Sequence, residues 1–376
     1  MHSRHLTHLL FLFLALLVIA ATLPAAAQGN AGAKLDATVP AGDFPVAVGV
    51  NSRTSKVYVP NNSSPSVTVI DERTKTSKTV ADVGGSFPNA IAVNSVTNKT
   101  YVANTGSGNI LVIDGATNHQ TEVTDPNGGF PLAVAVDQVL NKIYVANYTT
   151  NNITVIDGTN NSTTTVADPN AKGPRCIAVN PITHMVYVGN DQTGNITIID
   201  GLTRTTSTVA DPNASGPFAV DVNPVTNRVY FANFGSSNVT VLDATTDNTT
   251  TVTDPKSFNP VGIVVNPLTN KIYAVAQFPA NVTVIDGATN QTTTVTNPLA
   301  NQGQAIALDS LVNKIYVANF LSNNVTVVDG TTNQVSATVA DPKAKAPYAL
   351  RADPRTHRVF VANSQSANVT VIDGSR

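Results

Sequence analysis

The stretch Pro217–Asp254, PFAVDVNPVTNRVYFANFGSSNVTVLDATTDNTTTVTD, contains four short apolar segments separated by turns. Valine, threonine, leucine and aromatic residues dominate these segments, as expected for β-strands. Between the first two segments, Asn223, Pro224 and Asn227 favour a chain reversal. The stretch therefore predicts a four-stranded antiparallel sheet, with strands at 218–222, 228–232, 238–243 and 249–252.

This pattern recurs along the chain with a nearly constant period. An aspartate ends each third segment, and successive aspartates stand 43 residues apart, with a last step of 44. A period of this length with four short strands is typical of a β-propeller blade. Eight such units predict an all-β, eight-bladed propeller, with a seven-bladed ring containing one irregular unit as the alternative. The aspartates are Asp71, Asp114, Asp157, Asp200, Asp243, Asp286, Asp329 and Asp373.

Two further features favour a closed ring. In each innermost strand a small residue is followed by a large one, as in Ala219 and Val220, so neighbouring blades can interdigitate near the axis. The last unit ends after its third strand, whereas the segment 36–39 near the start resembles the outer-strand sequence at 336–339. We therefore expect the N-terminal segment to complete the last blade, which removes two exposed strand edges.

The first 27 residues read as a signal peptide. A short start containing one arginine precedes an apolar run at 9–23, and Pro24-Ala-Ala-Ala27 offers a small-residue cleavage site after Ala27. The run is shorter than the ~20 residues that span a bilayer, so we expect no transmembrane segment after cleavage. The sequence predicts export to the periplasm or the medium, with residues 28–376 forming one propeller domain.

Composition narrows the choice of partners. Charged residues make up 12% of the chain and the formal net charge is −2, which argues against a nucleic-acid surface. Cys176 is the single cysteine, so an intramolecular disulfide cannot form. We expect a monomer without a metal or another cofactor.

The chain resembles the YVTN family of β-propeller repeat proteins. The family tetrapeptide corresponds here to Tyr101-Val-Ala-Asn104, Tyr144-Val-Ala-Asn147 and Tyr316-Val-Ala-Asn319, and its companion phrase to Val284–Asn290. The resemblance covers the whole mature chain. It implies an exported bacterial or archaeal surface or periplasmic propeller. It supplies no catalytic residues, because the family motif is structural.

One face of the predicted ring varies between repeats. The loops between second and third strands share this face with the links between blades, and loops on a rigid scaffold often carry recognition. Aromatic residues and arginine are favoured at contact surfaces, so we expect a ligand or a partner protein to bind this variable-loop face. The alternative is that the aromatic residues fill gaps between blades. The predicted binding residues are Arg175, Phe218, Tyr348, Tyr148, Phe234, Phe278 and Phe320.

Two charges interrupt the innermost strands. Asp221 and Arg351 occupy a repeat position that is otherwise small or apolar, three blades apart. A charge near the crowded axis requires pairing or water, so we interpret them as hydrated or paired channel charges. The alternative is that Arg351 contacts a small anion or a substrate.

Catalytic signals are weak. The recurrent aspartates lie at hairpin turns, where an Asp side chain caps its own backbone. His119, His184 and His357 lie in similar turns, without carboxylates at a metal-ligand spacing. The sequence favours a non-catalytic binding module. A propeller enzyme of lactonase-like or related type is the main alternative, and a structural envelope protein is a weaker one.

Overall fold

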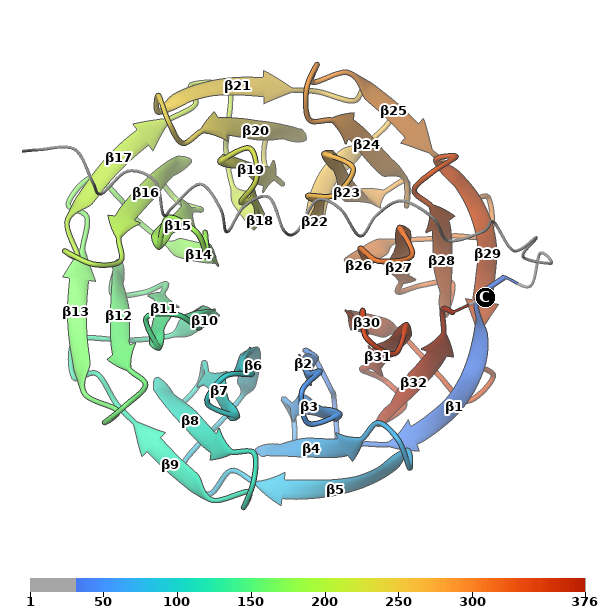
Figure 1. Ribbon diagram of the computed structural model, residues 1–376, viewed down its shortest axis with the longest axis horizontal. Coiled ribbons are helices and arrows are strands. Elements are labelled where there is room, and N and C mark those ends of the chain that lie inside the picture. Colours follow the sequence, from blue (N-terminus) through green and yellow to red (C-terminus); the bar gives the residue numbers. More distant parts are fainter. Residues whose placement is uncertain (1–31, 376) are drawn as a thin grey trace, which may run out of the picture. The chain divides into compact units, whose positions relative to one another are not determined.

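The computed structural model describes residues 32–375, and all of its regular elements are β-strands. The predicted signal peptide, 1–27, lies outside the described residues. Eight four-stranded antiparallel sheets are arranged as blades around a central axis (Figure 1). The prediction of eight blades is confirmed, and the seven-bladed alternative is wrong. We number the blades 1 to 8 in chain order, beginning with the sheet β2-β3-β4-β5.

The innermost strands line the axis. In blades 2 to 5, 7 and 8 they begin at the proline or glycine that follows the inter-blade link. Proline has no N–H to donate to the ladder, so it is tolerated at the first residue of a strand. These strands are β2 (Gly49–Asn51), β6 (Pro88–Asn94), β10 (Pro131–Asp137), β14 (Pro174–Val179), β18 (Pro217–Asn223), β22 (Phe258–Asn266), β26 (Gly303–Asp309) and β30 (Pro347–Asp353).

The second strands are the most deeply buried elements. Each carries a fully or almost fully buried aromatic residue, from Tyr58 to Phe360, at the repeat position noted in the sequence. They are β3 (Lys56–Asn61), β7 (Lys99–Asn104), β11 (Lys142–Asn147), β15 (Met185–Asn190), β19 (Arg228–Asn233), β23 (Lys271–Phe278), β27 (Lys314–Asn319) and β31 (Arg358–Asn363).

The third strands end at the recurrent aspartates. Each of these carboxylates accepts a hydrogen bond from a backbone N–H two residues later, as Asp286 does from Ala288 at 2.9 Å. The structure thus gives these aspartates a role in capping turns. The strands are β4 (Ser66–Asp71), β8 (Asn109–Asp114), β12 (Asn152–Asp157), β16 (Asn195–Asp200), β20 (Asn238–Asp243), β24 (Val282–Asp286), β28 (Asn324–Asp329) and β32 (Asn368–Asp373).

The outer strands form the rim, rich in threonine and largely exposed. Seven follow their third strand directly in sequence, and the eighth comes from the start of the chain. They are β5 (Thr76–Ala81), β9 (Gln120–Val123), β13 (Thr163–Ala167), β17 (Thr206–Ala210), β21 (Asn248–Val252), β25 (Thr292–Val295), β29 (Gln334–Ala340) and β1 (Lys34–Pro40).

Strand β1 closes the ring as the sequence predicted. It pairs antiparallel with β32, with Val39 opposite Val369. Its Asp36 also bridges the seam between the last and first blades, at 3.3 Å from Arg358 and 2.5 Å from Lys75. Both ends of the described chain are therefore held in blade 8.

Neighbouring blades pack large residues against small ones. A Cβ on Gly262 would lie 3.0 Å from a methyl group of Ile306 in the next blade, and one on Gly49 would lie 2.9 Å from Val93. The expected size alternation thus operates across the blade interfaces. Lysines at the start of second strands add hydrogen bonds between blades. Lys56, for example, donates to the carbonyl of Gly115 in the next blade at 2.6 Å.

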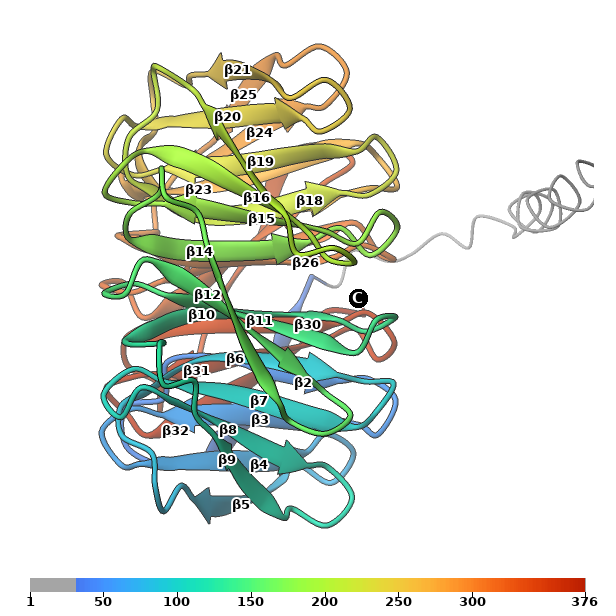
Figure 2. The same cartoon turned by 90° about the vertical axis from the view of Figure 1, so that its left-hand side faces the viewer.

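The antiparallel topology gathers the loops at the two ends of the ring, which Figure 2 shows from the side. The loops between the second and third strands of each blade and the links between blades form the variable-loop face. The hairpins that join the first to the second strand and the third to the fourth strand form the opposite face. Among residues 32–375, no helix has the length and apolarity needed to cross a bilayer.

Candidate functional site

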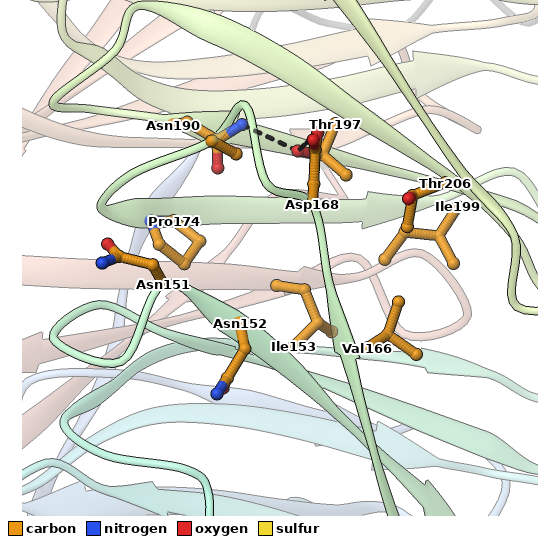
Figure 3. Close-up of a pocket in the computed structure, with 11 residues that line it drawn as sticks. Asn151, Asn152, Ile153, Val166, Asp168, Pro174, Asn190, Thr197, Ile199 and Thr206 are labelled. Atoms are coloured by element: carbon orange, nitrogen blue, oxygen red, sulfur yellow. Dashed lines mark hydrogen bonds between the residues drawn. The ribbon is translucent and has the colours of Figure 1, made fainter.

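Two hollows between blades, one at blades 3 and 4 and one at blades 5 and 6, are too small to hold a ligand. Figure 3 shows one between blades 3 and 4, lined by Ile153, Val166, Pro174 and Thr197 among others. Its volume is about 10 Å³, room for a single water at most. These hollows belong to the packing between blades.

A larger cavity opens at the axis on the variable-loop face. Its volume is about 520 Å³, within the range of small-molecule sites. In seven of the eight blades the cavity is lined by the residue that follows the proline or glycine after the inter-blade link, which in blade 1 is Pro45, ahead of β2. These residues are Val46, Asn89, Leu132, Arg175, Phe218, Gln304 and Tyr348.

A repeated backbone irregularity aims these side chains at the axis. In β10, Pro131 pairs with Asn147 and Ala133 with Ala146, so Leu132 has no partner across the ladder. The same shift occurs in the other innermost strands except β2. An extra residue of this kind turns its side chain out of the sheet, as β-bulges near functional sites commonly do. The bulges of six blades thus place six of the seven ring residues, and Val46 of blade 1 completes the ring without a bulge in β2.

Arg175 is held in place on one side of this ring. Its guanidinium lies 4.0 Å from the ring centroid of Phe218, a cation–π contact. The same group lies 3.8 Å from Asp191, which also accepts a hydrogen bond from the Tyr148 hydroxyl at 3.2 Å. Phe234 supports Phe218 from behind, with 5.8 Å between ring centroids. The half-buried Arg175 is thus preorganised rather than mobile.

Tyr348 is supported on the opposite side by a second aromatic group. Its ring centroid lies 6.2 Å from Phe44 and 6.4 Å from Phe320, the latter edge-on. Both separations are those of favourable aromatic pairs. Tyr348 therefore lines the cavity as a fixed aromatic wall.

The structure brings together six of the seven residues predicted from sequence. Arg175, Phe218 and Tyr348 line the cavity, whereas Tyr148, Phe234 and Phe320 support them from the second layer. The packing interpretation thus describes part of the role of these three supporting residues.

Phe278 is separate from both aromatic groups. It is 47% exposed at the end of β23, where it pairs with Phe258 across a longer hairpin. Sequence reasoning missed Asn89 and Gln304, the amides of the cavity wall, together with Leu132 and Val46. Their shared place after the innermost proline or glycine was the signal that could have identified them.

Aromatic residues in an unusual backbone conformation precede the innermost strands of three adjacent blades. Phe44, Phe87 and Phe130 precede the innermost prolines with φ of 56°, 53° and 55°, in the left-handed region. Gly173 and Gly216 hold this position in the next two blades and adopt it without a side-chain penalty. Bulky residues in this region are strained, and such strain concentrates at functional sites. The same conformation occurs at Asn259, Gln302 and Ala346 in the last three blades, so it belongs to the repeat, and phenylalanine occupies it on three adjacent blades.

The channel charges lie deeper along the axis. The half-buried Asp221 accepts hydrogen bonds from the backbone N–H groups of Val222 at 2.9 Å and Val265 at 2.7 Å. Desolvation raises its pKa to about 6, while these two N–H groups and, more weakly, the charge of Arg351 oppose the increase. Asp221 therefore ties blade 5 to blade 6, and Arg351 is exposed in the channel.

Histidines and the cysteine have structural positions. His184 contacts Asp137 at 2.7 Å and His357 contacts Asp309 at 2.9 Å, in both cases through Nδ1 and across a blade interface. Elsewhere this tie joins two asparagines, as in Asn94 and Asn141. Each histidine contacts a single carboxylate, and among residues 32–375 no group of three His, Cys, Asp or Glu side chains is arranged to hold a metal.

Cys176 is buried between blades 4 and 5. Burial raises the pKa of its thiol to about 12, which keeps it protonated at neutral pH. A protonated, buried thiol is a poor nucleophile. Cys176 therefore contributes to packing.

Comparisons with known proteins support the fold. No protein-family model and no curated protein matches the chain. A solved structure of hydrazine synthase from Kuenenia stuttgartiensis is similar, with a TM-score of 0.62 and 18% identity over 87% of this chain and 95% of that chain. A streptogramin B lyase structure is also similar, with a TM-score of 0.64 and 15% identity over 77% of this chain and 94% of that chain. At these identities the likeness shows a shared β-propeller fold.

Proposed function

We propose that this protein is an exported YVTN-type β-propeller that binds a ligand in the cavity at the channel mouth. The observation that carries the proposal is the ring of residues at the channel mouth. Seven blades each contribute a different side chain to one cavity, on a scaffold that is otherwise nearly uniform. Variation confined to a convergent position is what a recognition site requires.

The chemistry of the wall suggests the class of ligand. Arg175 offers N–H donors to a carboxylate or phosphate group, and Phe218 and Tyr348 offer flat apolar surfaces. The amides of Asn89 and Gln304 can donate and accept hydrogen bonds. We infer a small molecule, or the tip of a partner's loop, that combines an anionic group with an aromatic or apolar part.

Binding has more support than catalysis. The described cavity wall contains no carboxylate or histidine, the side chains that most often transfer protons in active sites. Export is supported by the apolar run at 9–23 with its small-residue cleavage site. The YVTN-type assignment is supported by the repeated Tyr-Val-Ala-Asn tetrapeptide.

The first test identifies the ligand and locates its site. Native mass spectrometry of protein purified from its host detects a retained small molecule, and calorimetry then measures its affinity. We expect Arg175→Ala and Phe218→Ala each to weaken binding by about 10- to 100-fold, as for buried contact residues. Arg175→Lys keeps the charge but loses the planar stacking, so an intermediate loss is expected.

The control is Arg53→Ala, which removes an exposed arginine from a hairpin of the opposite face. It should leave affinity unchanged. Circular dichroism and melting temperature verify that the folds are intact. Equal affinities for the wild type and for both alanine variants at the mouth would refute the site.

A further inference from the structure

Exposed aliphatic side chains recur at one turn position on the face opposite the cavity. The hairpin between the first and second strands of each blade, here called the inner hairpin, has a tip residue two positions after its capping Asn or Asp. In blades 2 to 7 this tip is valine, isoleucine or leucine, and each is 59–71% exposed. We call these six residues the aliphatic arc. They are Val96, Val139, Ile182, Val225, Leu268 and Leu311.

The turn itself does not require an apolar tip. An inner tip contributes its backbone N–H, as Leu268 does to the Oδ1 of Asn266 at 3.0 Å. The hairpins between third and fourth strands make the same bond, as Ala288 does to Asp286 at 2.9 Å. Seven of the eight tips there are alanine, threonine, serine or arginine, and Leu202 is the exception. The same turn thus accepts polar tips, so the apolar character of the arc has another cause.

Hydrogen bonds between blades hold the inner hairpins in one ring. Asn94 donates to Asn141 of the next blade at 2.9 Å, and Asn223 donates to Asn270 at 2.9 Å. Equivalent contacts join the hairpins at the other interfaces along the arc. The arc is therefore presented by preformed turns, and contact with a surface requires little ordering of the chain.

The two remaining blades complete the ring of tips with arginine. Arg53 of blade 1 and Arg355 of blade 8 are both exposed. The acids that cap inner hairpins, Asp137, Asp309 and Asp353, are at most 1% exposed. All eight inner hairpins lie within residues 32–375, and their exposed turn residues include these two positive charges and no negative one. Aliphatic side chains beside arginines are typical of surfaces that insert among lipid headgroups.

The chain enters the ring on this same face. Strand β1 begins at Lys34, which pairs with Asp373 at the end of β32, where the third strand reaches the face of the arc (Figure 1). Only residues 24–33 separate β1 from the apolar run at 9–23, and a run of this kind engages the bilayer during export. Ten residues reach at most ~35 Å, so this face is the one held near the membrane until cleavage.

We propose that this face of the propeller rests on a lipid bilayer, with the aliphatic arc among the headgroups and Arg53 and Arg355 beside lipid phosphates. A second copy of the chain fits the face less well, because the arginines of one inner ring would meet aliphatic tips or arginines of the other. The hairpins between third and fourth strands carry charges of both signs, so apolar insertion contributes more than charge. The cavity mouth then points away from the membrane, because the two faces lie at opposite ends of the ring (Figure 2).

The test is sedimentation with vesicles of equal parts phosphatidylglycerol and phosphatidylcholine, and with vesicles of phosphatidylcholine alone. The protein tested begins at Gln28, which removes the apolar run and keeps the whole compact unit 33–375. We expect binding to both kinds of vesicle, and tighter binding to the mixed ones. Leu268→Ser/Leu311→Ser should weaken binding by about 10- to 100-fold, because several inserted CH₂ groups are lost. Arg53→Ala should weaken binding to the mixed vesicles alone, by about fivefold.

The matched control is Leu299→Ser/Leu321→Ser, which removes two exposed leucines from the variable-loop face and should leave binding unchanged. Because the chain contains no tryptophan, Val225→Trp and Leu299→Trp report separately on the two faces. Vesicles should shift the emission of the first variant to the blue and leave that of the second unchanged. Circular dichroism and melting temperature verify that the variants are folded.

Equal binding by the wild type and by Leu268→Ser/Leu311→Ser would overturn the proposal, as would an unshifted emission of Val225→Trp. Failure of the wild type to sediment with either kind of vesicle would overturn it as well. A dimer in sedimentation velocity that Leu268→Ser/Leu311→Ser abolishes, without vesicle binding, would instead identify a second copy as the occupant of this face. None of these outcomes depends on the ligand of the cavity.

Discussion

At the scale of single residues, the repeats compensate one substitution with another. Next to the axis most blades set an alanine of the innermost strand opposite an alanine of the second strand. Where the first is enlarged to Cys176, the second is reduced to Gly189, and where the first is Gly262, the second is Val275. The summed volume of each pair stays similar, because both voids and excess atoms destabilise a closely packed interior.

This compensation predicts a strong coupling between Cys176 and Gly189. A Cβ at Gly189 would lie 2.6 Å from the Cys176 sulfur and 2.9 Å from Pro217, so Gly189→Ala should destabilise the fold by about 1–3 kcal/mol through overpacking. In the Cys176→Ala background the same change recreates the ordinary pair and should cost less than about 0.5 kcal/mol. Urea unfolding of the four proteins measures the coupling, and additive effects would contradict it.

At the scale of elements, two features of the strands determine the architecture. The bulge in seven of the eight innermost strands turns one residue out of the sheet, and β1 supplies the strand that blade 8 lacks. Thr38 of β1 donates to the carboxylate of Asp341, in the link between blades 7 and 8, at 2.8 Å, as Thr208 of β17 does to Asp168 between blades 3 and 4. Closure therefore restores both the ladder and the interface.

Removal of β1 should open the ring at a defined edge. A protein starting after Pro40 would expose the β32 ladder, and exposed edges promote pairing with other chains. We expect loss of hydrogen-exchange protection at Asn368–Asp373 and the appearance of oligomers in size-exclusion chromatography. A synthetic peptide of residues 34–40 should restore protection, and a scrambled peptide is the control. Unchanged protection after the deletion would show that closure adds little.

At the scale of the whole molecule, the seam between blades 8 and 1 carries a titratable group. Glu72 stands at a turn position that is glycine in six other blades and alanine in one. It is fully buried, its carboxylate accepts a hydrogen bond from Thr356, and Asp353 lies beside it. Burial raises its pKa to about 7, with a further increase from Asp353, while Thr356 and Arg358 lower it.

Because the pKa of Glu72 is raised, we expect the free energy of unfolding to fall as pH rises. The folded pKa of Glu72 is about 7 against an unfolded value of 4.5, so its contribution is complete below pH 4.5 and is lost as pH rises through about 7. The free energy of unfolding decreases by on the order of 3 kcal/mol from Glu72. The raised pKa of Asp221 adds a further decrease, complete by about pH 6. Urea unfolding from pH 4.5 to 8 should show this decrease, and Glu72→Gln should remove most of it. Equal slopes for both proteins would rule out Glu72 as the cause.

Much of the site could be anticipated from the repeat. Arg175, Phe218 and Tyr348 were predicted because they follow an innermost proline, and Asp36–Val39 because it resembles an outer strand. Asn89 and Gln304 were missed because the prediction selected aromatic residues and arginine, although both amides follow an innermost proline or glycine. The isolated position of Phe278 follows from the longer hairpin of blade 6, which one sequence does not reveal.

The sequence alone determined the blade, because strand, turn and buried tyrosine recur with one period and each unit specifies itself locally. It also determined the number of blades and the identity of the closing strand. Only the tertiary structure decided which side chains meet. The residues at the channel mouth lie about 43 positions apart or multiples of it, and they converge because eight sheets close into a ring and a bulge in most innermost strands turns one residue toward the axis. The exposure of the aliphatic arc likewise became evident only from the structure, because the sequence does not show which turn residues reach solvent.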